Sequence, residues 1–212
     1  MGKAVGLFGG TFDPVHIGHL RTALELQELL QLDEMRLLPC GDPYHRGNID
    51  VTPGEHRVAM LRLAVKDQPF LRVDDRELLR NGATYSYDTL VSVREELADD
   101  DRLLLCVGMD SLCNLSSWHR WQDLLSLANL VVACRPGFTP PTSGPVAELV
   151  AQYAVDSMEC MQSPSGAILI REMTLLSVSA TELRNKCRRG LSIKWLVPDV
   201  VNDYIVEHQL YR

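Results

Sequence analysis

The chain has 212 residues, of which 46% are hydrophobic, a net charge of −7 and an isoelectric point near 5.3. This length and hydrophobic content suffice for one domain with a substantial core. The acidic balance argues against a nucleic-acid-binding surface, which needs a basic face, and no apolar run approaches the ~18 residues of a membrane span. We therefore expect a cytoplasmic globular protein that acts with neither nucleic acid nor membrane.

Apolar runs typical of buried strands recur along the chain and alternate with helical patterns. They lie near residues 4–8, 35–39, 70–73, 103–107, 129–134 and 167–171. This alternation predicts an α/β fold, a Rossmann-like parallel sheet with helices on both faces. We treat residues 1–212 as a single domain, with a core at 1–176 and a small helical C-terminal subdomain at 177–212. The Pro- and Gly-rich segment 135–145 is expected to be a loop.

The most informative segment, GGTFDPVHIGH at residues 9–19, follows the first predicted strand. A glycine pair ends the strand, and apolar residues at helical spacing begin at Leu20. His16 and His19 flank the first turn of this helix, where free backbone N–H groups and the helix dipole favour anions. The segment therefore predicts a phosphate-binding loop, with a plain strand-to-helix connection as the alternative.

We expect no metal held by protein ligands. Zinc needs three or four ligands, and no companion motif accompanies the two histidines. The six cysteines show no metal spacing either, so we expect reduced, mostly buried thiols without disulfides.

Two segments have the pattern of a capping box, which marks a helix N-terminus. Residues 52–55 predict a helix that Thr52 caps and that runs through about Lys66, and residues 179–182 predict one that ends at Gly190. Capping alone would explain Ser179. Because ligands of open α/β sheets bind beyond the carboxyl ends of the strands, the two ends of the chain can meet there.

The segment at residues 9–19 resembles the HxGH signature of nucleotidyltransferases, and in this full form that of the bacterial nicotinate-mononucleotide adenylyltransferases. Residues 177–184, SVSATELR, resemble the family's second signature, Ile-Ser-x-Thr-x-Ile-Arg, with Val178 and Leu183 as conservative departures. The resemblance covers essentially the whole chain. It implies adenylyl transfer from ATP to nicotinate mononucleotide, giving deamido-NAD and pyrophosphate by direct in-line displacement.

The resemblance also assigns roles to residues. His16, His19 and Arg184 would be catalytic, and Mg²⁺ would bind through the phosphates of ATP. The implied ATP-binding residues are Gly9, Gly10, Thr11, Phe12, His16, His19, Gly108, Asp110, Ser179 and Arg184. The implied residues for nicotinate mononucleotide are Thr84, Tyr85, Ser86, Trp118, His119, His45 and Arg46. A homo-oligomer is left open.

Some of these residues have a structural alternative. Asp110 could be a helix N-cap rather than a ribose ligand, Ser86 could cap a helix, and Trp118 could be a core residue. The loop that contains His45 and Arg46 departs from relatives that carry asparagines in place of Cys40 and Gly41.

Two other functions compete. One is an adenylyl- or cytidylyltransferase acting on phosphopantetheine or another small phosphate, which would lack the Trp118 and 84–86 elements. The other is a non-catalytic nucleotide-sensing module, which intact His16, His19 and Arg184 argue against. Because the candidate residues around the pyridine ring include no Asp or Glu, we expect the nicotinate acid to be preferred over the amide.

Overall fold

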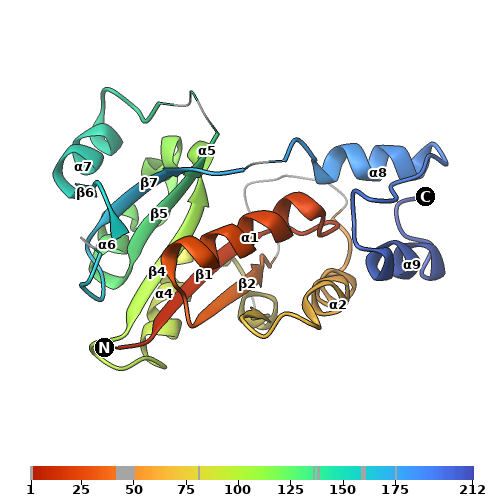
Figure 1. The fold of residues 1–212 in the computed structure, drawn as a ribbon, viewed down its shortest axis with the longest axis horizontal. Helices are drawn as coiled ribbons and strands as arrows, with labels where there is room; N and C mark the ends of the chain where they lie inside the picture. The colour runs from red at the N-terminus through yellow and green to blue at the C-terminus, as the bar shows by residue number, and fades with distance from the viewer. Residues whose placement is uncertain are drawn as a thin grey trace.

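The computed structural model describes residues 2–41, 51–80, 82–135, 137, 139–158, 161–174 and 176–212. Within them, seven strands form one sheet in the order β3-β2-β1-β4-β5-β7-β6, and every neighbouring pair is parallel (Figure 1). Their bounds are β1 Ala4–Gly10, β2 Glu34–Pro39, β3 Leu71–Val73, β4 Arg102–Gly108, β5 Asn129–Cys134, β6 Ala154–Val155 and β7 Ile168–Glu172. The six predicted strands are confirmed. The unpredicted β6 has only two residues, too few to give a pattern.

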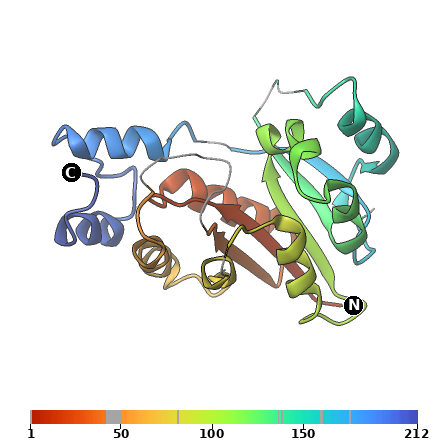
Figure 2. The same ribbon diagram turned by 180° about the vertical axis from the view of Figure 1, so that it is seen from behind.

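Helices cover both faces of the sheet, as predicted. One core cluster joins α1 (Ile17–Leu30), α2 (Gly54–Val65), α8 (Ala180–Arg188) and α9 (Asp199–Glu207) to one face. The other joins α4 (Ser86–Arg94), α5 (Met109–Cys113), α6 (Leu124–Leu127) and α7 (Pro145–Tyr153) to the opposite face. Figure 1 shows α1 in front of the sheet. Figure 2, the view from the opposite side, shows α4 and α5 in front of it.

The strands supply both clusters because their side chains alternate between the faces. On β4, Leu103 and Leu105 belong to one cluster, and Leu104 and Cys106 belong to the other. This is the burial expected of a central parallel strand, which is apolar on both sides. Among the described helices, none is long and apolar enough to cross a membrane.

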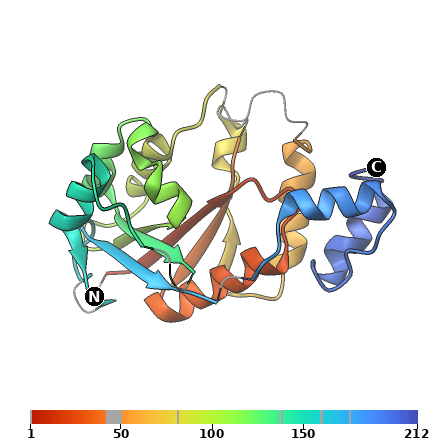
Figure 3. The same ribbon diagram turned by 90° about the horizontal axis from the view of Figure 1, so that it is seen from above.

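The two C-terminal helices lie to one side of the sheet. From above, α8 and α9 sit beside α2 at the opposite end of the molecule from α7 (Figure 3). Helix α8 begins where predicted, because Ser179 is its N-cap and Ser179 Oγ accepts the Glu182 N–H at 3.2 Å. It ends at Arg188, and Gly190 follows with a φ of +66°, close to the predicted stop.

The predicted capping box of α2 is wrong. The N-cap of this helix is Pro53, with no side-chain hydrogen bond. Thr52 is the residue before this N-cap, and its backbone is bonded to other side chains. Its N–H donates to Asp13 Oδ2 at 3.3 Å, and its carbonyl accepts Arg57 Nε at 2.9 Å.

The five described cysteines are all free thiols. Cys106 and Cys134 are buried, Cys40 and Cys187 are half-buried, and Cys113 is exposed, so the expectation of mostly buried thiols holds only in part.

Candidate active site

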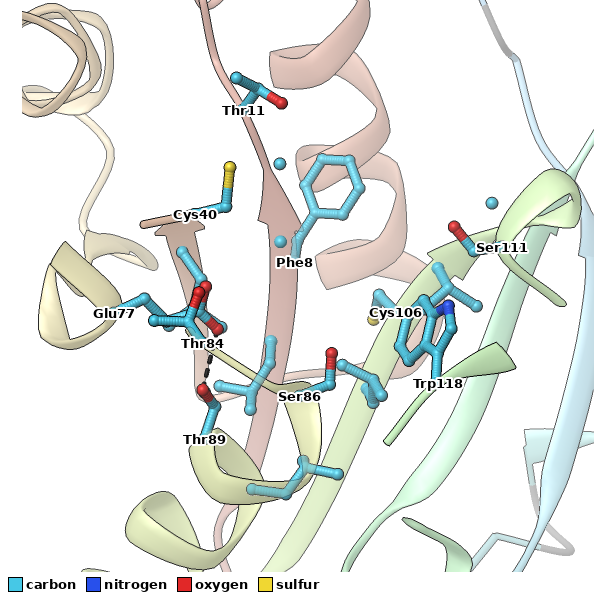
Figure 4. A pocket seen from close by; sticks show the side chains of 18 residues that line it. Phe8, Thr11, Cys40, Glu77, Thr84, Ser86, Thr89, Cys106, Ser111 and Trp118 are labelled. Atoms are coloured by element: carbon cyan, nitrogen blue, oxygen red, sulfur yellow. Dashed lines mark hydrogen bonds between the residues drawn. The ribbon is translucent and has the colours of Figure 1, made fainter. Parts of the chain in front are cut away.

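A cavity of about 430 Å³ opens where the strand order reverses, between the carboxyl ends of β1 and β4. In open α/β sheets this is the usual ligand position, and the volume suits a small organic ligand. Residues from α4 and from the segment after α5 complete its walls (Figure 4). The predicted site residues that line it are Gly9, Gly10, Thr11, Thr84, Ser86, Gly108 and Trp118.

His16 and His19 cap the start of α1 with each other's side chains. His16 Nδ1 accepts the His19 backbone N–H at 3.4 Å, and His19 Nδ1 accepts the His16 N–H at 3.3 Å. The two rings stack with centroids 3.6 Å apart. The Ile17 N–H is also taken, by the Leu196 carbonyl at 3.0 Å. An anion at this helix end would therefore depend on the imidazoles more than on the backbone.

These hydrogen bonds fix the tautomer of both histidines. Each Nδ1 accepts a hydrogen bond from a backbone N–H and so carries no hydrogen itself, which places the hydrogen of the neutral ring on Nε2. Burial lowers the pKa of His16 to about 4, and burial together with the charge of His16 lowers the pKa of His19 to about 3. At neutral pH the pair therefore presents two neutral Nε2–H donors. They can donate hydrogen bonds to developing negative charge, and neither ring changes its protonation state near neutral pH.

Gly18 and Phe12 shape the loop around these rings. A Cβ at Gly18 would lie 3.0 Å from His16 Nδ1, so glycine lets the His16 ring fold back over the helix. Phe12 has a φ of +50° and is 1% exposed; its ring packs edge-on against His19, with centroids 4.9 Å apart. A left-handed conformation costs a non-glycine residue about 1–2 kcal/mol, which the burial of the ring offsets.

Arg184 brings the second signature to the first. Its Nη1 donates to the carbonyl of Asp13 at 2.6 Å and lies 3.8 Å from Asp13 Oδ2. Asp13 is 2% exposed, and its Oδ1 also accepts the Tyr211 hydroxyl at 2.7 Å. Burial, with the neighbouring Asp13 charge, raises the pKa of Tyr211 above its ordinary value, so this hydroxyl stays a donor. The buried carboxylate therefore connects the C-terminal segment to the signature loop.

Arg57 from α2 is a second connector that sequence reasoning missed. It is 2% exposed, and its guanidinium donates to the carbonyls of Thr11, Cys40 and Thr52, each at 2.9 Å. These contacts fix the start of the signature loop, just after β1, against the end of β2. Nothing in the sequence distinguishes Arg57 from other helical arginines.

Asp110, Tyr85 and His119 are not among the lining residues, and the structure also decides the alternatives for Asp110, Ser86 and Trp118. Asp110 is exposed in the first turn of α5, and since the N-cap is Gly108, its alternative as an N-cap is wrong. The exposed His119 packs its ring on Tyr85 with centroids 4.5 Å apart. Tyr85, not Ser86, is the N-cap of α4. Trp118 both lines the cavity and packs on the core.

Two predicted residues, His45 and Arg46, lie outside the described residues. Glu77 is a lining residue that was not predicted from the sequence, so the cavity wall does contain an acidic side chain. No group of three or more His, Cys, Asp and Glu side chains that could hold a metal occurs within the described ranges.

Comparison with known proteins identifies the family. A family model described as cytidylyltransferase-like matches residues 7–186. A probable nicotinate-nucleotide adenylyltransferase of Pseudomonas paraeruginosa is 46% identical over 212 residues, covering 100% of this chain and 99% of that protein. One from Cellvibrio japonicus is 47% identical over 212 residues and is covered completely, as is this chain.

A solved structure supports the fold. The Plasmodium falciparum nicotinic acid mononucleotide adenylyltransferase complexed with NaAD has a TM-score of 0.71 at 20% identity, over 99% of this chain and 97% of that one. With the full-length relatives and the two signatures brought together, the chain belongs to the bacterial nicotinate-nucleotide adenylyltransferase family, within the cytidylyltransferase-like proteins.

Proposed function

We propose that this protein transfers the adenylyl group of ATP to nicotinate mononucleotide, releasing pyrophosphate and forming deamido-NAD for NAD biosynthesis. The observation that carries the proposal is the meeting of the two signatures, since Arg184 bonds to Asp13 in the same loop that leads to the stacked histidines. The names of the full-length relatives support the same reaction.

The arrangement suits a direct displacement. The pyridine ring would occupy the cavity beside Trp118, and the triphosphate would extend over the start of α1 toward α8. An oxygen of the mononucleotide 5′-phosphate attacks the α-phosphorus, and the bond from that phosphorus to the bridging oxygen of pyrophosphate breaks. Positioning and charge stabilisation are the main contributions a protein makes to such a step.

Each residue then has a defined task. The Nε2–H groups of His16 and His19 would donate to the α-phosphate oxygens as charge builds. Arg184 has guanidinium N–H groups beyond those bonded to Asp13 and Thr181, and these would hold the leaving phosphates beside the α8 terminus at Ser179. Asp110, in the first turn of α5 just after β4, would accept the ribose hydroxyls.

Mg²⁺ fits as a cofactor that ATP brings with it. The described residues offer no cluster of metal ligands, and Mg²⁺ commonly binds through substrate phosphates and water. When bound, it supplies positive charge that offsets the triphosphate.

The direct test is pyrophosphate release from ATP with magnesium and one candidate acceptor at a time. We expect release with nicotinate mononucleotide and none with phosphopantetheine. The cap-preserving variants His16→Asn and His19→Gln should each lower kcat by about 10²–10³, because each removes a donor aimed at developing charge. His208→Gln, at the exposed histidine that caps the C-terminal end of α9, is the matched control and should keep full activity.

Equal turnover with phosphopantetheine would place the protein with the other small-phosphate transferases. Histidine variants that weaken substrate binding but keep kcat would assign the imidazoles to ground-state binding.

A further inference from the structure

Glu77, on the short helix α3 (Arg76–Leu79), belongs to the wall of the cavity that also holds Thr84 and Ser86 (Figure 4). Its Oε1 accepts the hydroxyl of Thr89 at 2.8 Å, and Arg80 Nη1 donates to the same Thr89 oxygen at 3.0 Å. Arginine can only donate, so the Thr89 hydroxyl must point its hydrogen at Glu77. Oε1 is therefore an acceptor in every protonation state, and a proton on Glu77 must sit on Oε2.

The groups beside Glu77 are suited to an anionic ring substituent. Helix α4 starts at Ser86, so the backbone N–H groups and positive dipole of its first turn lie at this wall, together with the Thr84 and Ser86 hydroxyls. A Cβ at Gly41 would come within 2.8 Å of the Glu77 carbonyl oxygen and 3.1 Å of Thr84 Cγ2, so the Glu77 and Thr84 segments lie close together beside Gly41. Because Glu77, Thr84 and Ser86 line the same cavity, a ring substituent bound at this wall would lie near both the donors and the Glu77 carboxyl group.

The surroundings of Glu77 favour its protonated form. Burial raises its pKa above the ordinary value and the charge of Asp74 adds to this, while the Thr89 hydrogen bond and the charges of Arg80 and Arg76 act in the opposite direction. The neutral acid therefore persists to higher pH than in an ordinary glutamate.

We propose that Glu77 determines which pyridine substituent the cavity accepts: its Oε2–H donates to the carboxylate of nicotinate, whereas its ionised Oε2 accepts from the carboxamide of nicotinamide. This inference rests on the proposed function. Two carboxylates at one site share a proton or repel each other, so loss of the Glu77 proton removes a donor and adds a negative charge beside the nicotinate carboxylate. Preference for the acid therefore falls as Glu77 ionises.

The test is a competition between the two mononucleotides in one reaction with ATP, from about pH 6 to about pH 9. Both substrates carry the same 5′-phosphate, so its ionisation cancels in the ratio of their kcat/KM values. We expect the acid-to-amide ratio of the wild type to fall by about tenfold or more over this range. In Glu77→Gln, which donates but does not titrate, the ratio should stay constant. Glu28→Gln, an exposed site on α1 outside the cavity, should behave like the wild type.

A second variant separates this role from a structural one. Thr89→Val removes the hydrogen bond that lowers the pKa of Glu77, so the fall in the ratio should move to higher pH. The role of Glu77 would be overturned, with the proposed function left standing, by either of two results. One is a wild-type ratio that does not change with pH, and the other is a Glu77→Gln ratio that changes as the wild type does. Absence of pyrophosphate release with either mononucleotide would overturn the proposed function itself.

Discussion

The stacked histidines of the HxGH loop should make the protein less stable in mild acid. Their pKa values of about 4 and about 3 lie below the ~6.5 of an unfolded chain. Between these pKa values and about pH 6.5, the unfolded state therefore binds protons at the two histidines and the folded state does not. Stability is fully present above about pH 6.5 and is lost as the pH falls through that value toward the folded-state pKa values.

The size of the effect follows from these shifts. Between about pH 7 and about pH 5, each histidine that protonates only after unfolding lowers the free energy of unfolding by about 2 kcal/mol. The pair gives up to about 4 kcal/mol, a large part of the 5–15 kcal/mol that stabilises a typical domain. Because both rings are still neutral at about pH 5 in the folded state, their mutual repulsion does not complicate the sum.

Urea unfolding at the two pH values measures this loss. The double variant His16→Asn, His19→Gln keeps an Asn-x-x-Gln capping pattern but carries no imidazole in the loop. We expect the wild type to lose about 4 kcal/mol more than this variant, and the exposed-site control His208→Gln to behave like the wild type. If the double variant lost as much stability as the wild type, the loop histidines would titrate alike in the folded and unfolded chains, and the account of two neutral donors would be wrong.

Three further changes probe the same loop. Gly18→Ala should lower kcat by about tenfold while stability changes by no more than about 1 kcal/mol, because its Cβ displaces the His16 ring; an unchanged kcat would show that ring placement does not limit turnover. Arg184→Ala should raise the KM for ATP by about tenfold or more with a smaller change in kcat, and an unchanged KM would refute its contact with the leaving phosphates. Tyr211→Phe should cost about 2 kcal/mol in urea unfolding by removing the hydrogen bond to Asp13, and a loss below about 0.5 kcal/mol would contradict it.

The parts of the fold that depend on local pattern could be predicted from the sequence. Central parallel strands are apolar on both faces, so β1, β4 and β5 stand out as continuous apolar runs. The Ser179 cap is a short-range interaction, and it forms as expected. The meeting of the two signatures also followed, because the carboxyl ends of parallel strands share one edge of the sheet.

The parts that depend on long-range contacts could not be predicted. The capping pattern at Thr52 gave the wrong N-cap because the Thr52 N–H is bonded to Asp13, which is distant in sequence, and its carbonyl to the Arg57 side chain. A capping pattern includes neither contact. Glu77 was missed because it precedes the Thr84–Ser86 segment by several residues and joins the cavity only through the packing of α3. A buried arginine such as Arg57 has the same sequence signal as an exposed one.

The link between Asp13 and Tyr211 spans 198 positions, nearly the length of the sequence. During synthesis the signature loop leaves the ribosome early, while its two partners Arg184 and Tyr211, which bond to Asp13, arrive late. A nascent chain can form the sheet and both histidine caps and still have an incomplete phosphate site. Binding of ATP should therefore coincide with the docking of the final turn, so that a chain cut before Tyr211 would be a folded core without a finished nucleotide site.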